Sequence, residues 1–493
     1  MNVGDRIDIS DITSTGFQKN RLVWLEAIFI KTRKYFFLIQ ALMFIVFLYL
    51  SIGPLYAPIP KSHDTIFTNL TLLSQFAFWG IWYGFTLLSV IFVSRLWCGL
   101  LCPLGALSEW VGKLGLKKTT PSWVKWNGWL VVMFVVVTIL GQTMDVRDDP
   151  KGLVLLFLYI FTLAIIIGLI YGKKGSRPWC RYFCPIGKIL GVVSRVGILD
   201  FRPNKKRKNV DDLPEYVEKG LCPTDYNLSI KSSTLNCIAC GACVHAKPKA
   251  MLGLYIRRPG DEVKDIDNRG SNWSEVLFIL LAPGLAAGGF LWTILNNYTD
   301  LREYIGGYLL DENMLSWFNE ASQLVSSQTW NQHYNWLDVV TISAYMSIYG
   351  IVIALFLAIS NAAVAKLLTR NRDDFITCFK GIAYQLIPIS ILSIVIGLCG
   401  KFFSVLNSDF HVPNNVDVWI KILMLGSSMI WSLVLSWKFI QSYKQVNTIS
   451  RMASYCILIF NVGVILYLWW PAILGQGPMS EVEMIRQHII VPS

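Results

Sequence analysis

The chain has 493 residues, of which 54% are hydrophobic and only 15% are charged. A composition this apolar excludes an ordinary soluble domain and is typical of a protein that crosses a membrane many times. The net charge of +12 indicates the direction of these crossings more strongly than it indicates a nucleic-acid partner.

Apolar runs of about 20 residues, long enough to cross the hydrocarbon core as helices, recur along the sequence. The first run follows 34 residues that carry charges throughout, so we expect no removable signal peptide. The fold class predicted is an all-α polytopic membrane protein. About nine transmembrane helices are expected, at residues 35–53, 73–94, 126–142, 153–171, 274–295, 338–360, 377–399, 418–437 and 452–470.

The basic residues predict the orientation of these helices. If successive crossings alternate in direction, most of the 44 Lys and Arg residues fall in segments on one side of the membrane. Basic loops are retained in the cytoplasm. We therefore expect the N-terminus in the cytoplasm and the C-terminus on the outer side, which is the periplasm if the membrane is a bacterial inner membrane. The basic run at 205–208 is part of this bias, and no nucleic-acid partner is predicted.

The loops and spans divide the chain into four expected parts. Between the fourth and fifth spans lies the longest inner loop, which holds six cysteines and many turn-forming residues and is the one place for a small cytoplasmic domain. The predicted parts are a cytoplasmic N-terminal segment (1–34), a four-helix membrane core (35–200), a cytoplasmic ferredoxin-like domain (201–273) and a C-terminal membrane domain of about five helices (274–493).

An internal repeat links the second and fourth spans. The segment SRLWCGLLCPLG begins at Ser94, and SRPWCRYFCPIG begins at Ser176, with Ser, Arg, Trp, both Cys, Pro and Gly matching at an offset of 82 residues. This pattern predicts a duplicated helical hairpin whose copies are related by an axis along the membrane normal. The cysteines of the two copies should then meet at the cytoplasmic end of the core. They are Cys98, Cys102, Cys180 and Cys184.

These four cysteines, which we call the core cysteines, are candidate metal ligands. Within each pair the spacing is i, i+4, which places both thiols on one face of a helix or helical turn. Neighbouring arginines favour thiolates, and thiolates bind soft metals. A second metal or cluster site, two separate redox dithiols, or simple packing of small apolar side chains all remain open for them.

A second group of cysteines predicts an iron–sulfur cluster. In CIACGAC, the residues Cys237, Cys240 and Cys243 form the C-x2-C-x2-C run of a [4Fe-4S] site. In ferredoxins such a run takes its fourth ligand from a remote Cys-Pro, which is present here as Cys222-Pro223. Lys247 occupies the position of the cysteine that would serve a second cluster. We predict one [4Fe-4S] cluster on these four loop cysteines, since a zinc site normally uses two separated cysteine pairs.

Missing residue types exclude other chemistries. All five histidines lie outside the expected spans, which excludes a haem held by two intramembrane histidines. No nucleotide-binding loop is visible. Buried acidic residues are also expected to be missing from the spans, which argues against a proton-coupled permease. No catalytic residue is identified, so an enzyme activity of its own is not assigned.

The two WCxxxCP motifs combined with the ferredoxin cysteines resemble the membrane-bound polyferredoxin family of the NapH, NosR and CcoG type, over about residues 35 to 260. This resemblance implies a four-helix core, a cytoplasmic ferredoxin domain, and roles in moving electrons toward periplasmic reductases or in handling copper or iron. The chain differs from that group in having ligands for one ferredoxin cluster where members usually have two. About five additional spans also follow the ferredoxin loop.

The first functional hypothesis is a membrane-bound iron–sulfur electron-transfer protein, an electron-transfer component of an oxidoreductase system. It would pass electrons between a cytoplasmic or membrane donor and a membrane or periplasmic acceptor through redox partner proteins. The alternative is a factor that handles or reduces copper or iron with the core cysteines. A permease whose cluster only senses redox state is the third hypothesis.

Overall fold

The computed structural model describes residues 21–61, 63–203, 222–226, 228, 231–245, 252–326, 328–329 and 332–474. Lys247, His488 and the basic run at 205–208 lie outside these described residues.

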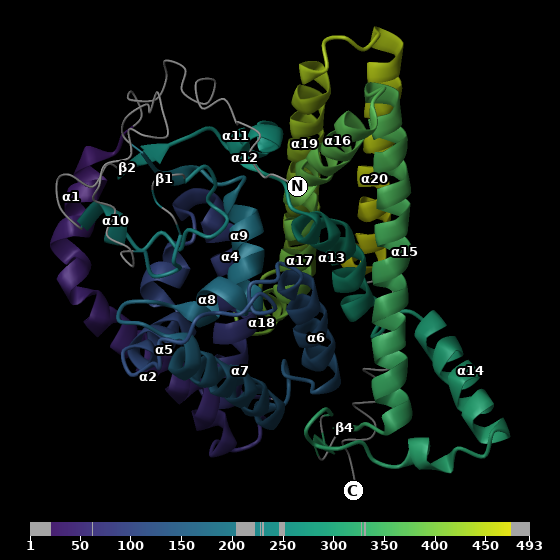
Figure 1. Ribbon diagram of the computed structural model, residues 1–493. Coiled ribbons are helices and arrows are strands. Elements are labelled where there is room, and N and C mark those ends of the chain that lie inside the picture. Colours follow the sequence, from purple (N-terminus) through teal and green to yellow (C-terminus); the bar gives the residue numbers. More distant parts are fainter. Residues whose placement is uncertain are drawn as a thin grey trace, which may run out of the picture. The chain divides into compact units, whose positions relative to one another are not determined.

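Eight helical segments of the described chain are long and apolar enough to cross a membrane. The predicted class, an all-α polytopic membrane protein, is therefore confirmed (Figure 1). The segments are Val23–Leu55, Leu70–Val93, Pro150–Tyr171, Trp273–Leu291, Trp336–Leu368, Arg372–Leu398, Asn415–Ser442 and Thr448–Ile473.

The third expected span, 126–142, is helix α6 (Trp129–Thr143) of 15 residues, about 22 Å long at 1.5 Å per residue, which is shorter than a typical hydrocarbon core. One sequence expectation about the spans needs correction, because buried acidic residues are present in them. Glu275 lies in the first turn of α13 (Trp273–Leu291) and is buried, so the argument against a permease based on their absence was wrong.

The helices begin and end as follows. In the first half of the chain they are α1 (Val23–Thr32), α2 (Phe36–Ile52), α3 (Leu70–Gln75), α4 (Tyr83–Val93), α5 (Pro103–Gly112), α6, α7 (Pro150–Tyr171), α8 (Pro178–Tyr182), α9 (Pro185–Ser194), α10 (Ala242–His245), α11 (Asp261–Lys264) and α12 (Ile266–Arg269). In the second half they are α13, α14 (Asn297–Asp311), α15 (Trp336–Leu368), α16 (Arg372–Gln385), α17 (Ile387–Leu398), α18 (Gly400–Ser408), α19 (Asn414–Ser442) and α20 (Thr448–Leu474).

Contacts between residues divide the chain into two compact units. Unit 1 comprises the described residues of 1–48, 86–133 and 160–272, and unit 2 comprises those of 49–85, 134–159 and 273–493. Both units contain parts of the first four spans, whereas the sequence-based division keeps those spans together. The four-part division remains a prediction.

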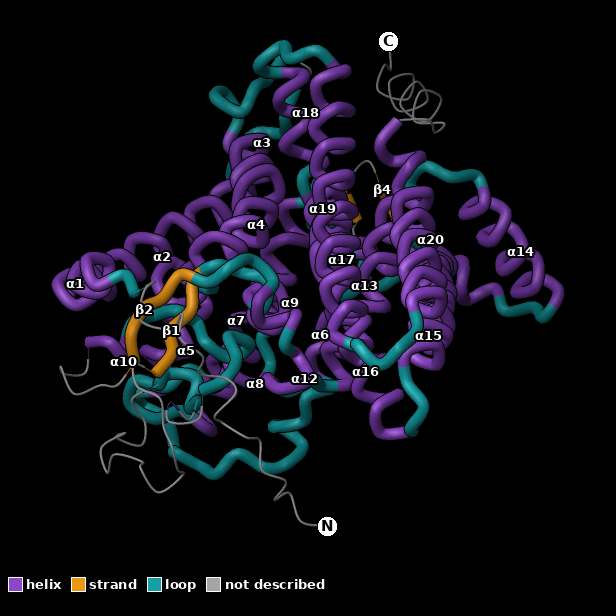
Figure 2. The backbone as a smooth tube through the Cα atoms, turned by 90° about the horizontal axis from the view of Figure 1, so that it is seen from above, coloured by secondary structure: helices purple, strands orange, loops and turns teal. Residues whose placement is uncertain are grey.

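Unit 1 holds the helix ends and loops that carry all eight motif cysteines. Strand β1 (Leu199–Pro203) pairs antiparallel with β2 (Leu252–Ile256), with Phe201 opposite Leu254. This two-stranded ribbon brackets the loop cysteines in the sequence, and Figure 2 shows it in orange beside α10. Phe201, Leu254 and Val244 form the buried cluster under the ribbon. The described part of residues 201–273 is thus compact, and its likeness to a ferredoxin remains a prediction.

Unit 2 is a helical bundle centred on α13 and α17, which are its most buried spans. Glycines let α13 and α15 pack closely, because a side chain at Gly284 would meet the backbone oxygen of Tyr349 at 2.5 Å. Two short strands, β3 (Gln328–Thr329) and β4 (Gln332–His333), pair in the loop before α15.

Candidate functional site

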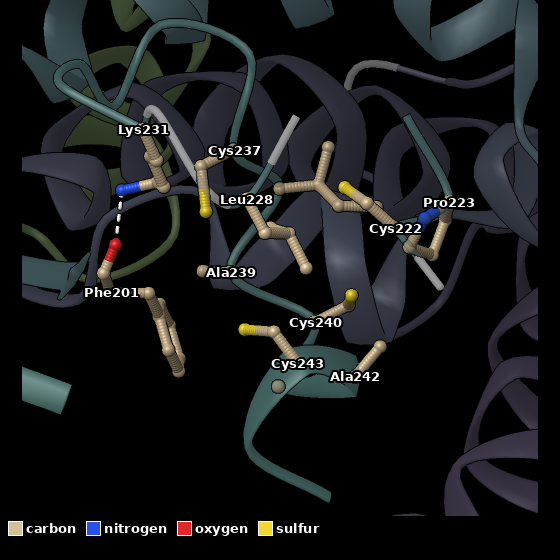
Figure 3. A pocket seen from close by; sticks show the side chains of 12 residues that line it. Phe201, Cys222, Pro223, Leu228, Lys231, Cys237, Ala239, Cys240, Ala242 and Cys243 are labelled. Atoms are coloured by element: carbon tan, nitrogen blue, oxygen red, sulfur yellow. Dashed lines mark hydrogen bonds between the residues drawn. The ribbon is translucent and has the colours of Figure 1, made fainter. Parts of the chain in front are cut away.

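The four loop cysteines lie around one pocket of unit 1 (Figure 3). Cys237, Cys240 and Cys243 come from the segment that leads into α10, and Cys222 comes from a separate segment of the loop. The empty space of this pocket is about 340 Å³, including space open to solvent. The structure thus brings together the four residues that the ferredoxin spacing selects.

Small residues and unusual backbone angles shape the loop between these cysteines. Ala239 and Gly241 have φ values of 50° and 67°, in the left-handed region that L side chains rarely adopt. A side chain at Gly241 would also lie 2.6 Å from the Phe29 ring. Ala239, Gly241 and Ala242 all line the pocket. A backbone held close to the pocket in this way suits a cluster whose sulfides accept hydrogen bonds from the main chain.

The remote cysteine is tied to the other three by hydrogen bonds. The sulfur of Cys222 lies 3.3 Å from the hydroxyl of Thr224, which in turn donates to the carbonyl oxygen of Asn236 at 2.9 Å. Asn236 immediately precedes Cys237. Thr224 therefore fixes the Cys222 segment against the start of the C-x2-C-x2-C run.

A buried cation stands at the edge of this pocket. The ammonium of Lys231 donates to the Asp200 carboxylate at 2.7 Å and to the Phe201 carbonyl, as Figure 3 shows for Phe201. Arg257 lies 3.8 Å from the same carboxylate. Burial alone would raise the pKa of Asp200, but Lys231 and Arg257 hold it well below its usual value. Lys231 and Asp200 therefore form a buried ion pair at this edge of the pocket.

Burial dominates the thiol chemistry of the loop. It raises the pKa values of Cys237 and Cys240, and it raises that of Cys243 well above the ordinary value. Lys231 opposes this effect at Cys237, and Arg33 opposes it at Cys240. Binding of a metal centre to these residues would thus release protons.

The core cysteines sit at two helix starts that are built alike. Cys102 and Cys184 are the N-caps of α5 and α9, each is followed by proline at the first helical position, and their ψ angles are 118° and 113°. Proline disfavours a helical conformation for the residue before it. The i, i+4 spacing predicted a helix or a helical turn for each pair. The structure shows that neither pair lies on one continuous helix. Each pair instead spans a break between a short helical turn and a new helix.

Matching hydrogen bonds confirm that the two copies of the repeat have the same local structure. The amide of Cys102 donates to the Trp97 carbonyl at 2.9 Å, and that of Cys184 donates to the Trp179 carbonyl at the same distance. The cysteine sulfurs then accept from the amides of Gly105 and Gly187, at 3.4 and 3.2 Å. Every partner in one copy is the 82-residue equivalent of its counterpart.

The two cysteine pairs come together in the buried part of unit 1. A side chain at Gly105, whose amide bonds to Cys102, would lie 3.6 Å from the sulfur of Cys180. Burial and the neighbouring thiols raise the pKa of Cys102 to about 11 and that of Cys184 to about 12. Cys102 and Cys98, from the other copy, are among the thiols that raise the pKa of Cys184.

The loop and core cysteines are separated by very little protein. A side chain at Gly99 in the first WCxxxCP motif would meet the backbone of Cys240 at 2.8 Å. Arg95 donates to the Leu235 carbonyl at 2.7 Å, and the Arg177 amide donates to the Pro223 carbonyl at 2.6 Å. Both repeat arginines therefore hold the cysteine loop against the core.

No three Cys, His, Asp or Glu side chains in the described part of the chain lie close enough to hold a single metal ion. One ion needs sulfurs about 2.3 Å from it. A four-iron cluster separates its cysteines more widely because each thiolate binds a different iron.

Comparison with protein families supports the iron–sulfur assignment. The 4Fe-4S binding domain family matches residues 75–121 and 154–209, and the Yip1 domain family matches residues 252–470. The first match covers the four core cysteines and ends before the loop cysteines begin. The chain thus contains a 4Fe-4S binding domain in its duplicated membrane core.

Curated relatives are similar to part of the chain. The putative electron transport protein YccM of Escherichia coli is 27% identical over 40% of this chain and 60% of its own length. The ferredoxin-type protein NapH of E. coli is 21% identical over 32% of this chain and 61% of its own length. The regulatory protein NosR of Pseudomonas aeruginosa is 24% identical over 24% of this chain and 19% of its own length.

The chain thus spans about 60% of the length of the first two of these relatives. No solved protein structure gives a significant match. The similarity to polyferredoxin-type proteins identified from the motifs is confirmed, whereas the roles of individual cysteines are not tested by it.

Sequence reasoning missed several residues of the site. Lys231 and Asp200 lie in a stretch without a recognisable motif, and nothing in the sequence predicts that they pair. The repeat arginines were identified only as neighbours that favour thiolates. Glu109, which binds Arg177 at 2.7 Å, has glycine, Gly191, at the equivalent position of the second copy. This difference between the two copies was the one feature of the sequence that could have pointed to Glu109.

Proposed function

We propose that this membrane protein, a relative of the polyferredoxin-type proteins YccM, NapH and NosR with a 4Fe-4S binding domain, transfers electrons within a membrane-bound oxidoreductase system. Redox partner proteins at the two faces of a bacterial inner membrane would supply and accept the electrons. The observation that carries the proposal is the convergence of the four loop cysteines on one pocket.

Cys222, Cys237, Cys240 and Cys243 would hold a [4Fe-4S] cluster, which supplies one-electron redox chemistry when bound. The chain's own residues prepare the site for it. Gly241 and Ala239 bring the main chain close to the pocket, and Lys231 places a fixed positive charge at its edge. Burial of Cys240 and Cys243 excludes water, which protects a redox centre from side reactions.

We further propose that the core cysteines hold a second iron–sulfur centre. Two observations support this: the 4Fe-4S binding domain match falls on them, and the two pairs lie together. Because Gly99 packs against the backbone of Cys240, electrons would have a short path between the two centres.

Iron analysis of anaerobically purified full-length protein tests both assignments. The ferredoxin motif alone predicts about four irons per chain, and the second centre raises the expectation to about eight. A yield of about four would restrict the chain to one cluster. Absence of iron together with absence of an EPR signal after reduction would reject the proposed function.

A cysteine variant tests the loop site directly. Cys222→Ser should make the loop cluster labile or convert it to a three-iron form, because this residue is the remote fourth ligand. The matched control is Cys456→Ser, since Cys456 is a single exposed cysteine of α20 outside both sets. If Cys222→Ser leaves the iron content and the EPR signal of the reduced protein equal to those of the control, some other group is the ligand.

The second candidate function is handling of copper or iron. The observation in its favour is the pool of four thiols in the core, because soft thiolates bind Cu(I). Stoichiometric copper in protein purified without added metal, retained when the loop cluster is removed by Cys222→Ser, would favour this function over electron transfer.

A further inference from the structure

Arg177 is buried between the two cysteine sets, and 2% of its surface is exposed. On the core side, one guanidinium nitrogen donates to the Cys98 carbonyl at 2.6 Å. A side chain at Gly105 would lie 3.0 Å from that nitrogen and 3.6 Å from the Cys180 sulfur. The positive charge of Arg177 and the core thiols are thus neighbours across a single glycine.

On the loop side, Arg177 is again one glycine away from a cysteine. Its other terminal nitrogen donates to the Gly99 carbonyl at 3.2 Å, and Gly99 packs directly against the backbone of Cys240. The Arg177 amide also donates to the carbonyl of Pro223, next to Cys222. The same buried charge therefore faces both sets.

The counter-charge of Arg177 is Glu109 in α5, which accepts from the Arg177 side chain at 2.7 and 2.8 Å and is 25% exposed. The repeat equivalent of Arg177 is Arg95, which donates instead to the Leu235 carbonyl and faces Gly191 where Glu109 would be expected. The ion pair thus joins the two copies of the repeat, and its symmetric equivalent cannot form because residue 191 is glycine.

We infer that Arg177 is a positioning residue that sets the reduction potentials of the centres held by both cysteine sets, with Glu109 as its opposing charge. This inference rests on the proposed function. Reduction adds a negative charge, and a nearby cation stabilises the reduced form. Loss of the arginine charge should lower the potentials, and loss of the glutamate charge should raise them.

An EPR-monitored redox titration of the full-length protein in detergent tests the inference with four variants. Arg177→Gln should lower the ratio of reduced to oxidised centre at a fixed potential by about tenfold, which for one electron corresponds to about 59 mV. Glu109→Gln should raise this ratio. Arg177→Lys should restore most of the wild-type value. Arg258→Gln, which removes an exposed arginine of the same unit, is the control and should change nothing.

Opposite shifts in Arg177→Gln and Glu109→Gln distinguish an electrostatic role from a structural one, because a loss of packing would change both variants in the same direction. Shifts of the same sign, no shift beyond that of Arg258→Gln, or loss of iron from both variants would overturn the inference. A wild-type protein without an EPR signal would reject the proposed function itself.

Discussion

Single residues decide the conformation of the core cysteines. Pro103 and Pro185 each start a helix and force the preceding cysteine into an extended conformation. The cysteine sulfur can then accept the amide hydrogen of the glycine three residues later. The amide hydrogen bond and the positive end of the helix favour a thiolate here, but burial outweighs them and raises the pKa of both cysteines. The proline in WCxxxCP therefore sets the conformation of the cysteine as well as ending the preceding helix.

Asp145, in the turn between α6 and α7, gives a prediction about pH. Burial, together with Asp148 and Asp149, raises its pKa to about 7. Between about pH 4 and pH 7, Asp145 therefore keeps its proton in the folded protein, whereas in the unfolded chain, where its pKa is near 3.9, it has lost it. Stability should fall as the pH rises from about 4 to about 7 and then level off. Asp145→Asn removes this penalty, so its gain in melting temperature should grow over the same pH range.

Asparagine is the suitable replacement because Asp145 has a φ of 46°, which asparagine tolerates. Thermal unfolding of the detergent-solubilised protein, followed by circular dichroism at pH 4.5, 6 and 8, measures the gain. The control, Asp311→Asn, removes an exposed carboxylate at the end of α14. A gain that is constant across this range, or no larger than that of the control, would contradict the assignment.

The limits of sequence reasoning are clearest for the charged residues. The spacing of the cysteines predicts both sets from the sequence alone. Arg177 and Arg95 are identical in the repeat, yet one pairs with Glu109 and the other with the Leu235 carbonyl. Their partners come from other segments of the fold, which no local pattern specifies.

At the level of elements, the cysteine loop breaks the symmetry of the repeat. Gly99 in the first motif corresponds to Arg181 in the second. Gly99 leaves room for the loop backbone at Ile238 and Cys240, whereas the Arg181 guanidinium lies 5.9 Å from the ring centre of Tyr226. The duplicated core therefore offers two different surfaces, and the loop packs closely on the one with glycine.

Gly99→Ala tests this contact. The added methyl group would lie 2.5 Å from the Ile238 oxygen and 2.9 Å from the Cys240 nitrogen, and backbone atoms cannot move away without shifting the loop. We expect faster loss of iron from the loop site and an unchanged helix content by circular dichroism. Gly463→Ala is the control, since nothing lies within 4 Å of the added atom. Equal iron retention in the two variants would show that the loop tolerates displacement.

At the level of the whole molecule, the short helix α6 raises the question of how often the chain crosses the membrane. The end of α4 and the end of α7 lie on the same side of unit 1, because Arg95 and Arg177, which follow them, both bind the cysteine loop. Helix α7 is long enough to cross. If α7 crosses, the chain must return through α6 before α7 begins, so we predict that α6 also crosses the membrane despite its 15 residues.

With α6 included, the chain would cross the membrane nine times. The basic residues favour a cytoplasmic position for the loop that carries Cys222, Cys237, Cys240 and Cys243, and on that basis we expect the N-terminus inside and the C-terminus outside. The hydropathy pattern predicts eight of the crossings well. It cannot decide whether α6 crosses, because a 15-residue apolar helix also suits a buried core segment.

Reporter fusions in a bacterial host test the topology. A fluorescent protein that folds only in the cytoplasm should be bright when fused in the loop after α9 and dark when fused to the C-terminus, and alkaline phosphatase should give the reverse pattern. A phosphatase fusion between α6 and α7 should be active, because the turn at Asp145 lies outside if α6 crosses. If that fusion is inactive while the fusion after α9 reports the cytoplasm, α6 and α7 do not form a membrane hairpin. The number of crossings before the cysteine loop must then be revised.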